Sequence, residues 1–273
     1  MTIEPGFIEI GNQDYHDGEG LSSSGIKKIL VSPADFKVPN VRTDTMAFGS
    51  MVHAYILEPE VFNSQYVMAP PGYKGTTTVG KLFKAESEAA GKEIIKPSDF
   101  DIIKNIKDAL LNNRTASHLL WGTEGVNEIA GYWNDPVTGV LCKLKPDRRV
   151  DSKRYIIDLK TCNNANEDEF NNSIYNFEYY ISAAHYLNGM KVLTSGEDWE
   201  KFICIAVEKT PPFKVKSYIL SDIWLYLGRE KCKEAIMKYA ECIATDNWPK
   251  FEDKAVTLTP KKWMMDKIIP YQQ

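Results

Sequence analysis

The chain has 273 residues, of which 43% are hydrophobic and 26% charged, and 33 Lys and Arg against 37 Asp and Glu leave a formal net charge of −4. These values are typical of a globular protein that can bury a large core. No run approaches the roughly 18 apolar residues that a membrane-spanning helix needs, which excludes a transmembrane protein.

The start of the chain and the cysteines indicate the compartment. Residues 1–11 carry Glu4 and Glu9 and have neither a basic leader nor an apolar run, so a signal peptide is not expected. The five cysteines are far apart and form no C-x-x-C pair, which argues against zinc and iron–sulfur sites. We therefore expect a cytoplasmic protein with reduced thiols and no contact with a membrane.

Helical periodicity dominates the first half of the chain. Leu21–Ser24 offers helix caps, and the apolar positions that follow end at Ser32-Pro33. Across 45–58, apolar residues recur every three or four positions, and His53 lies on the same face. His53 is therefore expected to point into the protein or into a cleft. Further helices are predicted over 81–90 and 97–112, after a loop at 70–80 that is rich in Gly, Pro and Thr.

Strands dominate the second half. The predicted elements are an antiparallel meander of strands over 126–133, 139–146 and 154–161, a helix over 172–190, strands over 201–207 and 215–220, and a long helix capped by Ser221. No repeat or linker divides the chain. Residues 1–273 are therefore expected to form a single α/β domain, with an N-terminal helical extension over about 1–45 and a C-terminal tail over about 246–273.

Two acids and a lysine converge on one predicted hairpin. Lys145-Pro146-Asp147 ends one strand, and Asp158-Leu159-Lys160 lies on the next. Strand alternation places Asp158 and Lys160 on one face and Leu159 on the other. Carboxylate and carbonyl oxygens are the ligands that Mg²⁺ takes, and a nearby lysine stabilises charge on a phosphate under attack. An isolated D-x-K is more commonly solvated, but its combination with Pro-Asp and with a helix bearing His53 predicts a site for phosphodiester hydrolysis.

These segments together resemble the exodeoxyribonuclease VIII (RecE-like) nuclease domain of the PD-(D/E)XK superfamily, which is related to RecB-like and lambda-type exonucleases. The resemblance spans most of the chain. It is carried by Tyr15-His16-Asp17, Leu21–Ser24, Ser32-Pro33, Gly49–His53, Leu57-Glu58-Pro59, Thr138–Lys143, Lys145-Pro146-Asp147 and Asp158-Leu159-Lys160-Thr161.

The resemblance implies a restriction-endonuclease-like α/β core, in which helices flank a mixed central β-sheet with an antiparallel meander. It implies a Mg²⁺ site, which Mn²⁺ could also occupy, held by His53, Asp147, Asp158 and the main-chain oxygen of Leu159, with Lys160 as the catalytic lysine. The implied activity is a DNA exonuclease that works from the ends of linear duplex DNA in recombination or repair, in a bacterium or its phage. A ring-shaped homo-oligomer and a single-strand annealing protein as partner are implied as well.

One family motif is incomplete. The pattern Gln-x-x-x-Tyr aligns with Ser182 to Tyr186, so a catalytic role is implied for Tyr186, whereas Ser182 replaces the glutamine. Serine is too short to reach the same water or phosphate directly, which puts the activity in doubt. His185 is expected to be a partly buried helix residue, with a phosphate contact as the alternative. Glu128 is either an outer acid near the site or an exposed strand residue.

The DNA contacts are predicted from local charge. Residues 141–154 contain six basic and two acidic side chains, a run that is either a solvated face or a track for phosphates. From this run Lys145, Arg148 and Arg149, and from the later helix Ser182, are predicted to contact DNA. The loop at 70–80 could also contact a strand, through its lysine and threonine side chains.

The sequence leaves two other functions to consider. Gly75–Leu82 approaches the phosphate loop G-x-x-x-x-G-K-[ST], but Leu82 takes the place of the hydroxyl that would hold Mg²⁺, which disfavours an ATPase or GTPase. The stronger alternative is a catalytically weakened nuclease fold that binds DNA ends or a partner, with Ser182 marking the decayed site.

Overall fold

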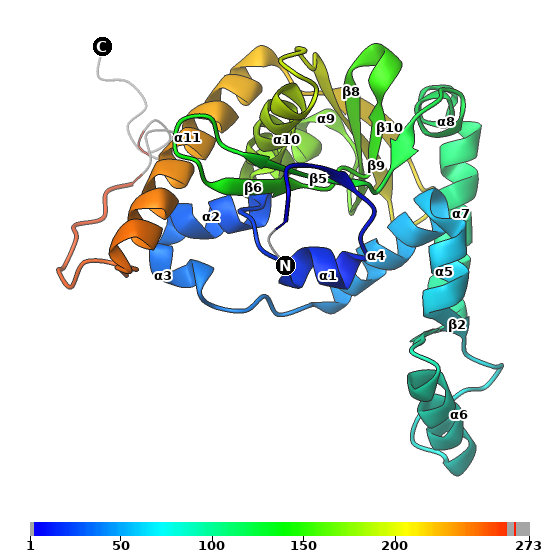
Figure 1. Ribbon diagram of the computed structural model, residues 1–273. Helices are drawn as coiled ribbons and strands as arrows, with labels where there is room; N and C mark the ends of the chain where they lie inside the picture. Colours follow the sequence, from blue (N-terminus) through cyan, green and yellow to red (C-terminus); the bar gives the residue numbers. More distant parts are fainter. Residues whose placement is uncertain (1–2, 261–264, 266–273) are drawn as a thin grey trace.

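In the computed structural model, which describes residues 3–260 and 265, a five-stranded mixed sheet lies between two groups of helices (Figure 1). Its strands, in spatial order, are β10 (Val215–Ile219), β9 (Lys201–Glu208), β8 (Tyr155–Cys162), β7 (Arg148–Val150) and β4 (Val126–Asn127). β8 and β9 are parallel, and the other neighbours are antiparallel. The predicted mixed sheet is thereby confirmed.

Alternate residues of the central strands face two separate hydrophobic cores. Ile157 and Leu159 of β8 belong to a core with helices α4 (Asp44–Leu57), α7 (Pro97–Asn112) and α8 (Arg114–Trp121). Ile156 belongs to the opposite core, with α2 (Ser23–Val31), α9 (Glu167–Asn176), α10 (Tyr179–Leu193) and α11 (Asp222–Thr245). A strand with both faces buried leaves little room for polar side chains, so the buried Asp158 on β8 needs partners within the protein.

A second, three-stranded antiparallel sheet continues from the first. It contains β1 (Gly6–Ile8), β5 (Ala130–Asn134) and β6 (Leu141–Leu144). The predicted strand over 126–133 is therefore corrected to two strands, β4 in the first sheet and β5 in the second, joined through Glu128. The predicted strand over 139–146 corresponds to β6, and Asp147 links it to β7 of the first sheet, a strand that was not predicted. Glu128 has a left-handed φ of 52°, and its N–H donates to the Asp147 carbonyl at 3.2 Å. The two acids thus lie side by side at the break between the sheets.

The N-terminal helices are part of the packed body. They are α1 (Asn12–Asp17), α2 and α3 (Pro33–Phe36). Ser22 caps α2, where its side chain accepts from the Gly25 N–H at 3.2 Å. Ile26 and Ile29 of this helix are almost completely buried in the core shared with α10 and α11. The segment expected as an extension therefore contributes to the main core.

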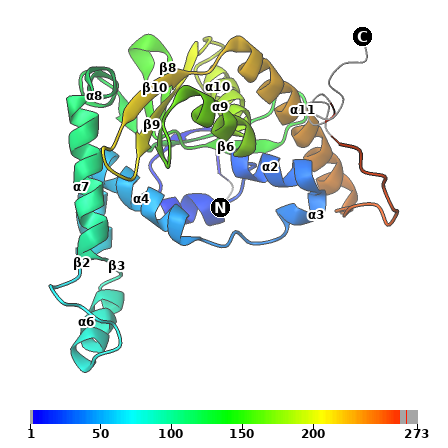
Figure 2. The same cartoon turned by 180° about the vertical axis from the view of Figure 1, so that it is seen from behind.

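An arm projects from the body beside α7 (Figures 1 and 2). It comprises α5 (Pro59–Gln65), the parallel strands β2 (Tyr66–Met68) and β3 (Glu93–Ile95), and α6 (Thr78–Ala89). Thr77 caps α6 by accepting from the Gly80 N–H at 3.1 Å. The preceding strand β2 is three residues long and ends well before this turn, so the strand-to-loop junction of a phosphate-binding loop is not formed.

The helix predicted over 172–190 is corrected to two helices. α9 ends at Asn176 and α10 begins at Tyr179, and between them Glu178 has a left-handed φ of 53°. The long helix predicted after Ser221 is confirmed as α11. Residues 246–260 contain no regular helix or strand, and the rest of the expected tail, apart from Met265, lies outside the described residues. No helix in the described part of the chain has the length and apolarity needed to cross a membrane.

Candidate metal and catalytic centre

The centre is built where two antiparallel strands separate. β7 pairs with β8 as far as Ile157, and the same register continued would place Pro146 opposite Leu159. Because proline has no N–H to donate, it cannot serve the Leu159 carbonyl, which accepts instead from His53 Nε2 at 2.8 Å. The Leu159 N–H donates to Asp147 Oδ2 at 2.6 Å. The Pro-Asp pair therefore opens the sheet, and the aspartate occupies the gap.

Three side chains from separate elements meet in this gap. Nδ1 of His53, from α4, lies 3.4 Å from Asp147 Oδ1 and 3.8 Å from Glu128 Oε1. One ligand atom from each of the three residues falls within 4.8 Å of the others, which is close enough for all three to hold one metal ion. The acids come from the two chain breaks between the sheets, so the fold itself brings them together.

The orientation of His53 suits a cation. Its Nε2–H is given to Leu159, so Nδ1 faces two carboxylates, and a neutral ring would direct its lone pair at them. Burial opposes a charged ring, but Asp147 and Glu128 outweigh burial and raise the pKa of His53 to about 10. A proton therefore occupies this position when no metal is bound. One imidazole nitrogen and two carboxylates form a donor set of the kind that divalent cations take in proteins, so the residues present fit a divalent metal ion.

Asp158 and Lys160 form a second pair beside the first cluster. Lys160 Nζ lies 2.7 Å from Asp158 Oδ2. Burial lowers the pKa of Lys160, but the charges of Asp158 and Asp147 outweigh burial and raise it above its ordinary value. Burial and the charge of Asp147 raise the pKa of Asp158, whereas at Asp147 the positive charges of His53 and Lys160 outweigh burial and lower the pKa. The lysine therefore remains an ammonium ion between two acids.

Tyr186 and Ser182 lie one turn apart on α10. Burial, followed by the charges of Asp158 and Asp147, raises the pKa of Tyr186, so its hydroxyl stays neutral close to the acids. Both Ser182 and Tyr186 are half-buried. His185 is a helix residue, as predicted, but it is fully rather than partly buried, and its Nε2 lies 3.0 Å from the Lys143 carbonyl oxygen.

The basic run at 141–154 is divided between the interior and the surface, because Lys143, Lys145 and Arg148 are buried whereas Lys153 and Arg154 are exposed. Arg148 is buried, and its guanidinium donates to the carbonyls of Leu119 and Thr123 and to the side chain of Asn127. These contacts tie α8 to β4, and the burial of the guanidinium keeps Arg148 away from the protein surface.

The other two predicted DNA-contacting residues of this run are also engaged. Lys145 is buried, donates to the Asn12 side chain and lies 3.4 Å from Glu128 Oε2. The guanidinium carbon of Arg149 lies 3.9 Å from the centroid of the Phe7 ring. The three basic residues predicted to contact DNA are therefore engaged in contacts within the protein, and Lys145 in particular holds Glu128.

Glu128 is the residue that sequence analysis placed least well. The sequence allows either an outer acid near the site or an exposed strand residue, and the structure shows a side chain that is 8% exposed and belongs to the cluster of three potential ligands. Its left-handed backbone turns the side chain out of the strand pattern on which the expectation rested. A carboxylate within a strongly apolar strand was the available signal, because a buried acid requires a partner.

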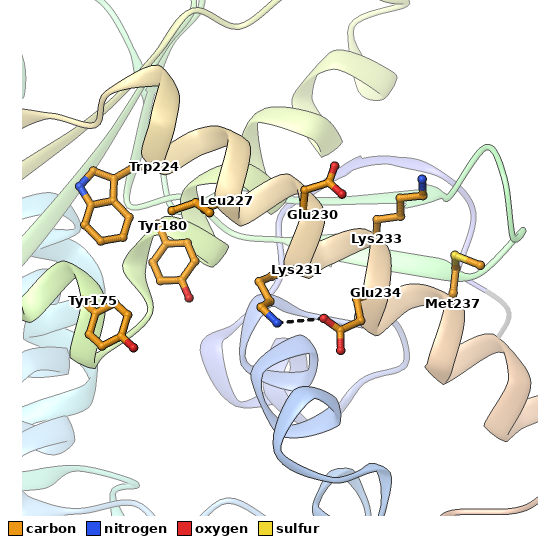
Figure 3. A pocket seen from close by; sticks show the side chains of 9 residues that line it. All are labelled: Tyr175, Tyr180, Trp224, Leu227, Glu230, Lys231, Lys233, Glu234 and Met237. Atoms are coloured by element: carbon orange, nitrogen blue, oxygen red, sulfur yellow. Dashed lines mark hydrogen bonds and ion pairs between the residues drawn. The ribbon is translucent and has the colours of Figure 1, made fainter. Parts of the chain in front are cut away.

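A separate surface pocket lies at the junction of α9, α10 and α11 (Figure 3). Tyr175, Tyr180 and Trp224 form its aromatic part, and Lys231 lies 2.9 Å from Glu234. Two lysines and two glutamates line the pocket, so their charges cancel. None of the candidate metal ligands lines it.

Comparison with known proteins places these features in context. A model of the family described as a PDDEXK-like domain of unknown function (DUF3799) matches residues 22–258. The crystal structure of a candidate exonuclease from Eubacterium rectale is similar, with a TM-score of 0.61 and 14% identity over 97% of this chain and 100% of that chain. A phage related exonuclease from Haemophilus somnus 129PT gives a TM-score of 0.37 and 14% identity, over 84% of this chain and 97% of that chain. No curated protein matches the sequence.

Proposed function

Because the chain belongs to the family of PDDEXK-like domains of unknown function (DUF3799), we propose that it is a Mg²⁺-dependent deoxyribonuclease that degrades duplex DNA from its ends. Family membership and the fold shared with the Eubacterium rectale protein confirm the predicted nuclease-like fold class. The observation that carries the proposal is the cluster of His53, Glu128 and Asp147 directly beside the Asp158–Lys160 pair.

In this proposal His53, Glu128 and Asp147 hold the metal ion, with Asp158 and the Leu159 carbonyl adjacent to it. When bound, a divalent cation lowers the pKa of a coordinated water and neutralises charge on the phosphate. His53 must lose its Nδ1 proton to bind, and its Nε2 hydrogen bond to Leu159 fixes the ring orientation throughout. Lys145, held against Glu128, limits the movement of that carboxylate.

Lys160 acts as a fixed positive charge. Its raised pKa keeps the side chain protonated near neutral pH, so it stabilises the extra negative charge of the attacked phosphate rather than removing a proton. Asp158 orients the ammonium group through their 2.7 Å contact. The neutral Tyr186 hydroxyl can donate to a phosphate oxygen near the same acids.

The wider biological proposal rests on the resemblance to RecE-like exonucleases. It places the enzyme in recombination or repair in the cytoplasm of a bacterium or of a host cell infected by its phage. It takes residues 1–273 as one nuclease domain. A ring-shaped homo-oligomer and a single-strand annealing protein as partner complete this proposal.

Ser182 supports a second candidate function. The serine stands where the related nucleases have glutamine, so the chain could bind DNA ends or a partner with little cleavage. The acids and the lysine of the centre remain in place and favour hydrolysis.

Digestion of end-labelled linear duplex DNA, compared with a covalently closed circle, tests the proposal. We expect cleavage of the linear DNA with Mg²⁺ or Mn²⁺, none with EDTA, and survival of the circle. Asp147→Asn should abolish cleavage, whereas Asp151→Asn, at a side chain that is 56% exposed, should not. Binding without cleavage would favour the second function, and cleavage of the circle would refute the requirement for an end.

A further inference from the structure

Two aromatic rings form a stack that leads from Lys160 to the surface. Lys160 Nζ lies 5.2 Å from the centroid of the half-buried Tyr179 ring. The ring of Phe177 stacks on that of Tyr179, with centroids 5.6 Å apart and planes at 26°. Phe177 itself is 60% exposed. The stack therefore connects the centre with solvent and ends in an open aromatic ring.

The backbone holds this stack in place. Glu178, between the two aromatic residues, adopts a left-handed conformation that a residue with a side chain rarely takes. Lys27 of α2 fixes the corner from outside, where its Nζ donates to the Phe177 carbonyl at 2.8 Å. Strained backbone that persists in a well-packed region is characteristic of functional sites. The turn at Phe177 and Glu178 is therefore held in one conformation, which keeps the Phe177 ring exposed to solvent.

The charges around the stack identify the chemistry of its ligand. Lys27 Nζ lies 5.8 Å from the Tyr179 centroid, so two ammonium groups flank this ring. Burial, followed by repulsion from Lys160, lowers the pKa of Lys27 to about 8. Lys160 is already paired with Asp158, but within the described part of the chain the ammonium group of Lys27 has only the Phe177 carbonyl as its partner. An apolar protein segment on this surface would bury Lys27 without supplying an anion, whereas a nucleotide brings an aromatic base and an anionic phosphate together.

We propose that Phe177 and Tyr179 form a stacking platform for an unpaired nucleobase at the end of the DNA. This inference rests on the proposed nuclease function and specifies its substrate. Every base has a flat aromatic face, so stacking accepts any sequence. The terminal base pair opens, one base stacks on Phe177, and its phosphate lies beside Lys27 and Lys160. The preferred substrate is therefore a frayed or single-stranded end.

The test uses a short linear duplex with 2-aminopurine, a fluorescent base that stacking quenches, at either the 3′ or the 5′ terminus. Binding is measured with Ca²⁺ in place of Mg²⁺, so that hydrolysis does not contribute. We expect quenching with the wild-type chain and its loss in Phe177→Ala. The affinity of that variant for a frayed end should fall roughly 5- to 150-fold, the range for loss of one stacked base. Phe177→Trp should preserve quenching.

Tyr175→Ala supplies the matched control, because Tyr175 is a comparably exposed aromatic residue two positions earlier, in α9, and lines the separate pocket. It should quench like the wild type. The platform would be overturned if Phe177→Ala quenched 2-aminopurine as strongly as the wild type, or if the wild type bound the DNA without quenching. Either result would leave the nuclease proposal intact. Binding itself is measured by the anisotropy of an internally labelled DNA. If the wild-type chain bound no DNA, both the stacking platform and the nuclease proposal would be overturned.

Discussion

The side chain of Glu128 illustrates how single residues define this centre. It is fixed by Lys145 on one side and faces His53 on the other, so its carboxylate is positioned before any metal binds. Glu128→Gln keeps the size but removes the charge, and we expect Mn²⁺ affinity to fall at least tenfold in calorimetric titration. Glu124→Gln, at an exposed position four residues earlier, is the control. Equal affinities in the two variants would exclude Glu128 as a ligand.

His185 gives a residue-level prediction for stability against pH. Burial lowers its pKa to about 4, whereas the unfolded chain has an ordinary value of about 6.5. The unfolded state therefore gains a proton first, so the stability contributed by the neutral ring is complete above pH 6.5 and is lost as the pH falls towards 4. The loss amounts to about 3 kcal/mol.

Urea unfolding between pH 7 and pH 4.5 measures this loss. His185→Gln retains an amide donor for the Lys143 carbonyl but cannot titrate, so its stability should fall less steeply than that of the wild type. His118→Gln, on the exposed face of α8, should follow the wild-type slope. Identical slopes for His185→Gln and the wild type would contradict the assignment.

At the scale of elements, hydrophobic periodicity predicted the helices that pack by a repeating apolar face. It missed the chain breaks that depend on the backbone conformation of a single residue. α7 and α11 were recognised because their apolar faces repeat over many turns. The breaks at Glu128 and Glu178 were missed, because left-handed residues are usually glycine and glutamate gives no such signal. The Pro-Asp and D-x-K pattern predicted that Asp147, Asp158 and Lys160 lie close together on neighbouring strands, but the burial of Lys145 and Arg148 depends on tertiary contacts that no local pattern contains.

The contact between α10 and α11 makes a prediction at this scale. Replacement of a helical glycine by alanine usually stabilises a helix, but a Cβ at Gly228 would lie 2.2 Å from the Tyr180 carbonyl oxygen. Gly228→Ala should therefore destabilise the fold by about 1–3 kcal/mol. At Gly49 of α4 an added Cβ meets nothing within 4 Å, and Gly49→Ala should stabilise by about 0.5–1 kcal/mol. Chemical denaturation measures the free energy of unfolding of both variants. Changes of the same sign in the two variants would refute the close packing of Gly228 against Tyr180.

For the whole molecule, the net charge of −4 and the internal use of Lys143, Lys145 and Arg148 leave a limited positive surface near the centre. Lys143, for example, donates to the carbonyls of Tyr15 at 2.6 Å and Gly18 at 2.5 Å, which anchors the N-terminal segment. DNA held at this centre would therefore rely on the few cations beside the stack and on base stacking rather than on a broad basic track.

This distribution of charge predicts a shallow dependence of DNA affinity on salt. Each neutralised phosphate contributes about −0.9 to the slope of log K against log salt concentration for duplex DNA. With roughly two to four phosphate contacts, the slope should lie near −2 to −4. Fluorescence anisotropy of a labelled duplex, with Ca²⁺ and increasing NaCl, measures it. Lys27→Gln should remove about one phosphate contact and so make the slope less negative by about 0.9, whereas Lys104→Gln, on α7, should leave the slope unchanged. A slope of about −6 or steeper would require an extended basic surface and would contradict the local, stacking-assisted mode of binding.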